Sequence, residues 1–289
     1  MTTAEILKKV RKIEIKTKGL SSHIFSGEYH SAFKGRGMSF SEVREYSPGD
    51  DVRTIDWNVT ARFSTPFVKV FEEERELTVM LLVDVSGSSL FGTAQLNKRE
   101  MITEICAVLA FSATTNNDKV GVIFFSDKVE QYIPPKKGKS HILRIIRELI
   151  TMQPVQNRGT DICCCLEFLN NVMRKRAITF LISDFISEEY EYPLKMAARR
   201  HDLVGMQVYD RMDMELPDAG LLQVQDSETG TSRWIDSTHP ATRISYASGF
   251  KKQQQYNTET FLRAGAQLLS VRTDQDYIKT LQGFFRARI

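Results

Sequence analysis

Residues 77–83 form an apolar run of strand length, with Thr78 as its one polar residue, and the run ends abruptly at Asp84. A continuous apolar run bounded by turn-forming residues is typical of a strand buried on both faces of a parallel sheet. Asp84 then lies where the strand leaves the core, and Ser86 and Ser88 lie on the following turn, which Gly87 allows to be tight. Oxygen-bearing side chains at every second position can converge on one hard cation, although an ordinary strand end has a similar composition.

The pattern after Asp84 alternates between helical and strand-like segments. Apolar residues at helical spacing predict helices within residues 102–113, 142–150, 161–169 and 192–200. Apolar runs predict strands at residues 119–126, 177–184 and 203–208. Strands that alternate with helices predict an α/β fold in which a doubly wound, mostly parallel sheet lies between two helical layers, as in Rossmann-type proteins. The crossover connections are expected to be right-handed.

The end of the chain predicts a hairpin, a long helix and a closing strand and helix. The hairpin is expected at residues 220–224 and 231–236, with its turn around Thr229 and Gly230. The long polar helix is expected at about 243–264, the last strand at 267–271 and the last helix at 277–286.

The first part of the chain differs in composition from the rest. Ile6, Leu7, Val10 and Ile13 recur at helical spacing and predict a basic amphipathic helix over residues 3–18. Residues 33–58 are dense in glycine, aromatic side chains and charges of both signs. We therefore expect two parts, an N-terminal charged, Gly-rich extension over 1–75 and an α/β domain over 76–289.

Acids and arginines alternate in this extension and suit a network of bidentate ion pairs around Trp57. The residues concerned are Glu42, Arg44, Glu45, Asp50, Asp51, Arg53, Asp56 and Arg62. Such a network is either a structural clamp or a surface for a partner.

Composition excludes several classes of protein. The chain has 289 residues, 42% of them hydrophobic and 26% charged, and its net charge of +3 is too small to indicate nucleic acid binding. Three of the four cysteines, Cys163, Cys164 and Cys165, are adjacent, which favours buried thiols in a reducing, cytoplasmic compartment over disulfides or a metal cluster. The sequence shows no signal peptide pattern and no run near the roughly 20 apolar residues that span a bilayer.

Two acids and three hydroxyls are expected to meet at one edge of the sheet. Asp84 and Asp184 each end an apolar strand, and parallel strands deliver their carboxyl ends to the same edge. Thr160 opens a helix from a loop at that edge. A divalent cation among Asp84, Ser86, Ser88, Thr160 and Asp184 would neutralise carboxylates that otherwise repel each other.

This three-loop pattern resembles the von Willebrand factor A domain and its metal-ion-dependent adhesion site. Residues 84–88 match the Asp-x-Ser-x-Ser motif, residues 159–161 match the threonine loop, and residues 182–184 match the distal aspartate. The resemblance implies that Ser86, Ser88 and Thr160 bind Mg²⁺ (or Mn²⁺ or Ca²⁺) directly. It implies that Asp84 and Asp184 act directly or through water.

The upstream block resembles the bacterial "domain of unknown function 58" family. The resemblance covers residues 31–208, and the residues that characterise its charge-rich block are Arg36, Glu42, Arg44, Tyr46, Asp50, Asp51, Arg53, Asp56, Trp57 and Arg62. The family implies a partner-binding protein, often encoded beside a MoxR-type AAA+ ATPase, that acts as an adaptor in chaperone-like maturation. A second von Willebrand factor A protein is the other implied partner, and attachment to the inner membrane would run through such partners.

The leading hypothesis is a non-enzymatic module in which a carboxylate of a partner protein completes the coordination of the cation. The first alternative is phosphoryl transfer with Asp84 as nucleophile, but Ser86 occupies the position where such phosphatases need a second aspartate. The second alternative is a scaffold that the metal merely stabilises. The five histidines lie far apart without motif spacing, so no catalytic triad is expected.

Overall fold

The structure is a computed structural model that describes residues 11, 39–63, 65–72, 77–93, 96–152, 159–187, 189–225 and 230–288. These residues belong to two compact units, a small one within residues 33–77 and a large one that contains residues 78–289. The predicted N-terminal basic helix, residues 3–18, lies outside the described residues except for Arg11.

The large unit is built on a six-stranded sheet with the order β10-β7-β6-β3-β4-β5. Its strands are β3 (Thr78–Asp84), β4 (Lys119–Phe125), β5 (Val129–Lys136), β6 (Ile178–Ser183), β7 (Asp202–Tyr209) and β10 (Gln267–Arg272). Numbered along the chain from the β5 edge, the order is 3-2-1-4-5-6, which is the doubly wound arrangement. All neighbouring pairs are parallel except β4 and β5. The predicted α/β fold class is confirmed.

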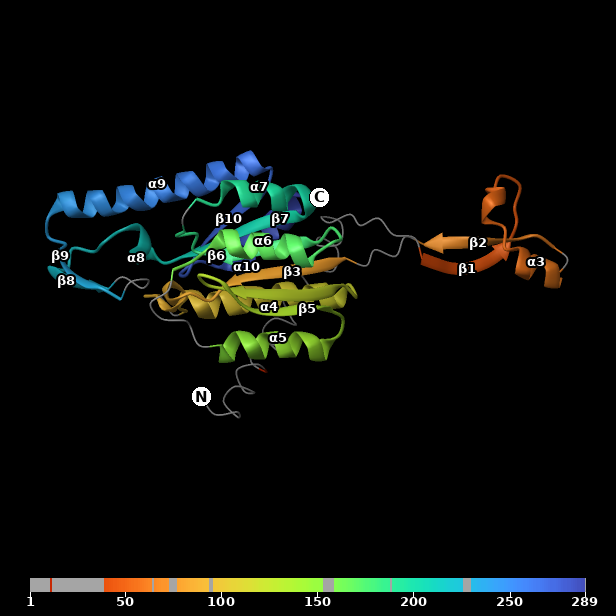
Figure 1. Cartoon of the computed structure of the whole chain (residues 1–289), viewed down its shortest axis with the longest axis horizontal. Coiled ribbons are helices and arrows are strands. Elements are labelled where there is room, and N and C mark those ends of the chain that lie inside the picture. Colours follow the sequence, from red (N-terminus) through yellow and green to blue (C-terminus); the bar gives the residue numbers. More distant parts are fainter. Residues whose placement is uncertain are drawn as a thin grey trace. The chain divides into compact units, whose positions relative to one another are not determined.

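Helices cover both faces of this sheet (Figure 1). They are α4 (Lys98–Thr115), α5 (Lys139–Thr151), α6 (Ile162–Val172), α7 (Glu191–Arg200), α9 (Pro240–Ala264) and α10 (Tyr277–Ala287). Helices α4 and α5 pack together on one face, whereas α6, α7 and α9 form a continuous layer on the other. Short elements complete the unit: η2 (Gly87–Leu90), α8 (Arg211–Met214) and the hairpin of β8 (Leu221–Gln225) and β9 (Ser232–Asp236).

Strand β3 is the centre of the core. Its residues 79–83 are fully buried, as the uninterrupted apolar run predicted. Met80 and Leu82 belong to one hydrophobic cluster with residues of α6, α7 and α9, including Phe261. Because alternate residues of a strand point to opposite faces, Val79, Leu81 and Val83 pack toward the α4 side.

The sequence pattern missed one strand of the sheet. Strand β5 pairs antiparallel with β4 at the edge and contains Pro134 and Pro135. Proline cannot donate a ladder hydrogen bond, so it is tolerated at an edge, and a half-exposed edge strand needs no continuous apolar run. Helix α9 begins at Pro240, three residues before the predicted start, because proline suits the first turn of a helix.

The small unit contains a two-stranded antiparallel sheet and two short helices. These are β1 (Ser39–Glu45), η1 (Val52–Thr54), α3 (Trp57–Phe63) and β2 (Phe67–Glu72). Arg44 donates two hydrogen bonds to the Asp50 carboxylate, at 2.8 and 2.7 Å, which is the predicted bidentate geometry. The Asp51 carboxylate accepts from the backbone of Arg53 at 2.9 Å and caps η1.

The ion pairs do not enclose Trp57 as expected, because its side chain is 68% exposed. Asp56 instead accepts from the backbone nitrogen of Asn58 at 3.0 Å and lies 3.5 Å from the Lys69 ammonium. These acids therefore stabilise local turns rather than a shared network. Arg36, another residue of the charge-rich block, lies outside the described residues.

Gly205 provides a test of the packing between the sheet and α9. A Cβ at this position in β7 would overlap the Phe261 ring and lie 2.8 Å from Leu268 Cδ1. Gly205→Ala is therefore expected to lower the free energy of unfolding by about 1–3 kcal/mol, because overpacking forces neighbours out of their rotamers. Urea denaturation measures the change. Gly283→Ala in α10 is the control, since a Cβ there meets no heavy atom within 4 Å, and it is expected to leave stability unchanged or slightly raised.

Candidate functional site

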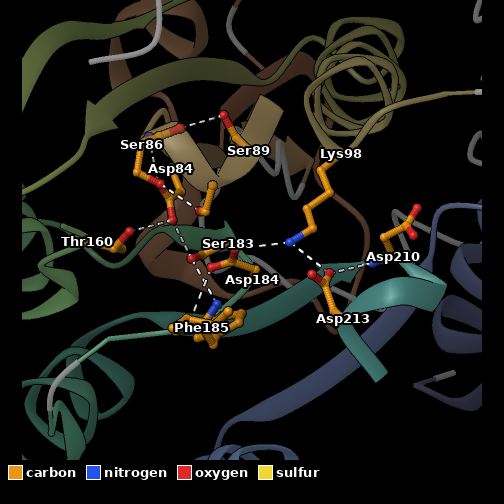
Figure 2. Close-up of polar contacts among 12 residues, drawn as sticks. Asp84, Ser86, Ser89, Lys98, Thr160, Ser183, Asp184, Phe185, Asp210 and Asp213 are labelled. Atoms are coloured by element: carbon orange, nitrogen blue, oxygen red, sulfur yellow. Dashed lines mark hydrogen bonds and ion pairs between the residues drawn. The ribbon is translucent and has the colours of Figure 1, made fainter. Parts of the chain in front are cut away.

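The candidate site lies at the point where the strand order of the sheet reverses. Asp84 is the last residue of β3, and Asp184 directly follows β6, the neighbour of β3. Ligands of doubly wound proteins bind at this point, outside the carboxyl ends of the strands. The loop that carries Thr160 runs into α6 at the same edge, so the three predicted loops meet there (Figure 2).

The Asp84 carboxylate is the centre of the site and is 3% exposed. Its Oδ1 accepts a hydrogen bond from the backbone nitrogen of Ser86 at 2.9 Å. Its Oδ2 accepts from Ser183 Oγ at 2.6 Å and from Thr160 Oγ1 at 3.5 Å. The structure therefore brings Thr160 within reach of Asp84, although the two residues are 76 positions apart.

Ser86 and Ser88 present their hydroxyls side by side, with the two Oγ atoms 3.0 Å apart. The loop is held by Ser89, whose hydroxyl donates to the Ser86 carbonyl at 2.7 Å. The turn after Asp84 thus places the Ser86 hydroxyl beside the carboxylate, with the Ser88 hydroxyl next to that of Ser86.

The threonine loop is fixed from both sides. Asp161 caps α6 by accepting from the backbone nitrogen of Cys164 at 3.0 Å, so Asp161 and not Thr160 is the N-cap. The carbonyl of Thr160 accepts from Ser187 Oγ at 2.8 Å, and the Asp161 backbone donates to the Ser126 carbonyl at 2.8 Å. The Thr160 hydroxyl is consequently free of capping and points toward Asp84.

The electrostatics of the site fit a divalent cation. Burial, together with the charge of Asp184, raises the pKa of Asp84 to about 6, against the lowering effect of its hydrogen bonds from Ser183 and Ser86. A raised carboxyl pKa means that the ionised form lacks sufficient compensation. Mg²⁺ would supply that charge, and the residues that would hold it are Asp84, Ser86, Ser88, Thr160 and Asp184.

Within the described part of the chain, no three His, Cys, Asp or Glu side chains come together as a group of metal ligands. A cation at this edge therefore depends on the hydroxyls as well as on the two acids. A set made only of oxygen ligands suits a hard ion such as Mg²⁺. Zinc and copper prefer imidazole and thiolate ligands instead.

The structure adds a residue that the sequence did not single out. Lys98 is 2% exposed, and its ammonium lies 3.3 Å from Asp184 Oδ2 and 2.8 Å from Asp213 Oδ2 (Figure 2). Burial by itself would lower the pKa of Lys98, but the charges of Asp184 and Asp213 outweigh it and raise that pKa. Asp184, the distal acid of the predicted metal set, is thus already paired with an internal cation.

One local signal pointed to Lys98. It is the first residue of α4, after the N-cap Asn97. A positive charge is unfavourable at the positive end of the helix dipole, so a lysine there indicates carboxylates from elsewhere in the fold. Ser183, the second missed residue, gives no such signal, because a serine at the end of a strand is common.

Asp210 holds the segment that carries Asp213. Its carboxylate accepts from Thr93 Oγ1 and from Thr273 Oγ1, each at 2.6 Å, and from the backbone of Met212 at 2.9 Å. These hydrogen bonds outweigh the effect of burial and lower the pKa of Asp210 to about 2. The Asp210 backbone nitrogen donates to Asp213 Oδ2 at 2.7 Å, which fixes the carboxylate that meets Lys98.

None of the helices among the described residues is both long enough and apolar enough to cross a bilayer.

Comparisons with known proteins place the chain among bacterial relatives. The uncharacterized protein Rv1480 of Mycobacterium tuberculosis (strain ATCC 25618 / H37Rv) is 33% identical over 282 residues, which cover 96% of this chain and 88% of that protein. The uncharacterized protein YeaD of Bacillus subtilis (strain 168) is 28% identical over 109 residues, which cover 38% of this chain and 25% of that protein.

A similar solved structure is the conserved hypothetical protein BatB from Bacteroides thetaiotaomicron. It is 16% identical, with coverage of 73% of this chain and 98% of that chain and a TM-score of 0.46. The strand order of the six-stranded sheet establishes the fold class of the large unit.

The matched family spans both units of the structure, from β1 in the small unit into α9 of the large one. The family model described as "Protein of unknown function DUF58" matches residues 42–256, and this chain therefore belongs to the DUF58 family.

Proposed function

We propose that this protein is a non-enzymatic, metal-dependent protein-binding module. Asp84, Ser86, Ser88, Thr160 and Asp184 hold a divalent cation, and a carboxylate of the partner protein completes its coordination. Mg²⁺ is the expected ion, with Mn²⁺ or Ca²⁺ as substitutes, because all the protein ligands are oxygens.

The observation that carries this proposal is the meeting of the three loops around the buried carboxylate of Asp84. Exposed apolar side chains flank these loops, namely Leu90 and Phe91 after the serine motif and Ile186 after Asp184. Apolar side chains left in water beside a polar centre are typical of protein interaction sites.

We propose a MoxR-type AAA+ ATPase as the partner, or a second von Willebrand factor A protein, with this chain acting as an adaptor. The family resemblance motivates this assignment. A cytoplasmic location belongs to the same proposal and agrees with the four free cysteines, since thiols persist in a reducing compartment.

The small unit contributes a second observation in favour of binding. Val52, Trp57 and Phe63 are exposed large apolar residues in it. Of the two alternatives for the charge-rich block, these side chains favour an interaction surface over a clamp.

The test is capture of the purified ATPase, in its nucleotide-free form, on the immobilised chain with Mg²⁺ or with EDTA. We expect capture by the wild type in Mg²⁺, and a loss of at least tenfold in EDTA or with Asp84→Ala, because the bridging cation is absent. Asp127→Ala is the matched control, since Asp127 is an exposed acid that follows β4 at the same edge of the sheet.

Equal capture in all four samples would contradict a metal bridge. If Mg²⁺ raised the melting temperature while capture stayed constant, the metal would be a structural stabiliser, which was the scaffold alternative.

A further inference from the structure

A cavity of about 350 Å³ lies beside the candidate metal site, and neither the family nor the proposed function accounts for it. Its walls come from the ends of β6 and β7, from α8 and from the first half of α9. Its lining includes Asp184, Asp213, Tyr209, Tyr246, Gly249 and Phe250.

The charge of the cavity selects the class of ligand. Two carboxylates, those of Asp184 and Asp213, line it, and among the described residues both contact one ammonium, that of Lys98. Lys98 is itself buried and does not line the cavity. In the metal-free protein one negative charge is therefore left over, which repels phosphate or carboxylate ligands and attracts a cation.

The Asp213 carboxylate also retains an open acceptor. Asp213 uses Oδ2 for both Lys98 and the Asp210 backbone, so among the contacts of the described residues its Oδ1 has no donor. A carboxylate with an open oxygen at the wall of a cavity can accept from a ligand N–H.

Aromatic side chains form the other walls. The rings of Tyr209 and Phe250 lie 5.4 Å apart between centroids and are inclined by 44° to each other. Tyr246 is anchored by its hydroxyl, which donates to the Met212 carbonyl at 3.0 Å. Aromatic rings near carboxylates favour a guanidinium group, which stacks on ring faces and pairs with a carboxylate through its planar N–H groups.

Gly249 keeps the cavity open. It lies inside α9, where glycine is unfavourable compared with alanine. Packing does not require it, because a Cβ at this position would meet no heavy atom within 4 Å. Because Gly249 lines the cavity, a larger side chain at this position is expected to take up part of that space.

We propose that this cavity binds a guanidinium group, presented by an arginine side chain of a protein partner. The site recognises the cation through the open oxygen of Asp213, with the charge of Asp184 beside it, and holds its plane against the aromatic walls. This inference does not depend on a bound metal.

The probe is N-acetyl-L-arginine N-methylamide, titrated into the full chain in EDTA and followed by chemical-shift changes or calorimetry. The neutral isostere N-acetyl-L-citrulline N-methylamide is expected to bind at least about tenfold more weakly, a difference of roughly 1.4 kcal/mol. Gly249→Leu is expected to weaken binding of the arginine probe by at least the same factor, because the added side chain fills the cavity.

Gly283→Leu is the matched control, because Gly283 also lies in a helix where a Cβ meets no heavy atom within 4 Å. It is expected to bind the arginine probe as the wild type does. Four outcomes would overturn the proposal: no saturable binding of the arginine probe, equal affinity for the citrulline probe, undiminished binding by Gly249→Leu, or tighter binding of the corresponding lysine probe. Because EDTA is present throughout, none of these results depends on the metal-bridge proposal.

Discussion

Lys98→Met is expected to lower the free energy of unfolding of the metal-free protein by about 3–5 kcal/mol, the usual effect of removing one partner of a buried ion pair. Methionine has a similar length but no charge. Without the ammonium, the carboxylates of Asp184 and Asp213 repel each other, and water reaches them poorly because the position of Lys98 is 2% exposed. Urea denaturation at neutral pH in EDTA measures the loss.

For the same variant we expect the opposite effect, a larger stabilisation than in the wild type, when Mg²⁺ is added. In the wild type the ammonium repels a cation near Asp184, whereas the variant has one more uncompensated negative charge. Added Mg²⁺ is therefore expected to raise the melting temperature of Lys98→Met more than that of the wild type, by preferential binding to the folded state.

Lys195→Met is the control, because Lys195 is an exposed lysine on α7. We expect it to change the free energy of unfolding by no more than about 0.5 kcal/mol. A loss in Lys98→Met no larger than in Lys195→Met would show that the internal ion pairs contribute nothing to stability.

Asp84→Asn is expected to abolish the rise in melting temperature that Mg²⁺ produces in the wild type. It is also expected to stabilise the metal-free protein at neutral pH, by up to about 3 kcal/mol, because a pKa shift of one unit corresponds to about 1.4 kcal/mol. The pKa of Asp84 is raised to about 6 by burial and by Asp184, so folding without metal requires the ionised acid to be buried.

The direction of this pKa shift determines how the stability of the protein changes with pH. A carboxyl whose folded pKa lies above its unfolded value binds more protons in the folded state, so its contribution to stability falls as the pH rises between those values. For the Asp84 carboxyl this interval runs from its ordinary pKa of 3.8 to about 6. In EDTA, the stability advantage of Asp84→Asn over the wild type should therefore grow across this interval and stay constant above it.

Asp127→Asn serves as the control for the response to Mg²⁺, because this acid at the same edge is exposed. It should keep the rise in melting temperature that Mg²⁺ produces in the wild type. A wild type that does not respond to Mg²⁺, or an Asp84→Asn variant less stable than the wild type in EDTA at neutral pH, would contradict the electrostatic account of the site.

Much of the sheet followed from local pattern. A strand buried on both faces must be apolar at nearly every position, so β3, β4, β6 and β7 were visible as mostly apolar runs. The edge strand β5 was not, because it is only partly buried and its sequence carries two prolines. The mixed direction at this edge therefore emerged only from the pairing of β5 with β4.

The small unit shows the limit of reading charges from sequence. The alternating acids and arginines suggested a network around Trp57, and the bidentate pair of Arg44 and Asp50 does form. Yet Asp51 and Asp56 bind nearby backbone nitrogens instead, because short polar side chains readily satisfy local turns.

Local sequence pattern was sufficient to predict the α/β class, the ends of the central strands and the oxygen-bearing residues that follow them, since burial and turn formation act on neighbouring residues. The folded structure was needed to find that Lys98 enters the site from α4, that Ser183 donates a hydrogen bond to Asp84, and that α9 leaves a cavity beside Asp184. These contacts join residues up to 99 positions apart. The energies of these contacts depend on distance and burial in the folded chain, and neither quantity can be obtained from the order of residues alone.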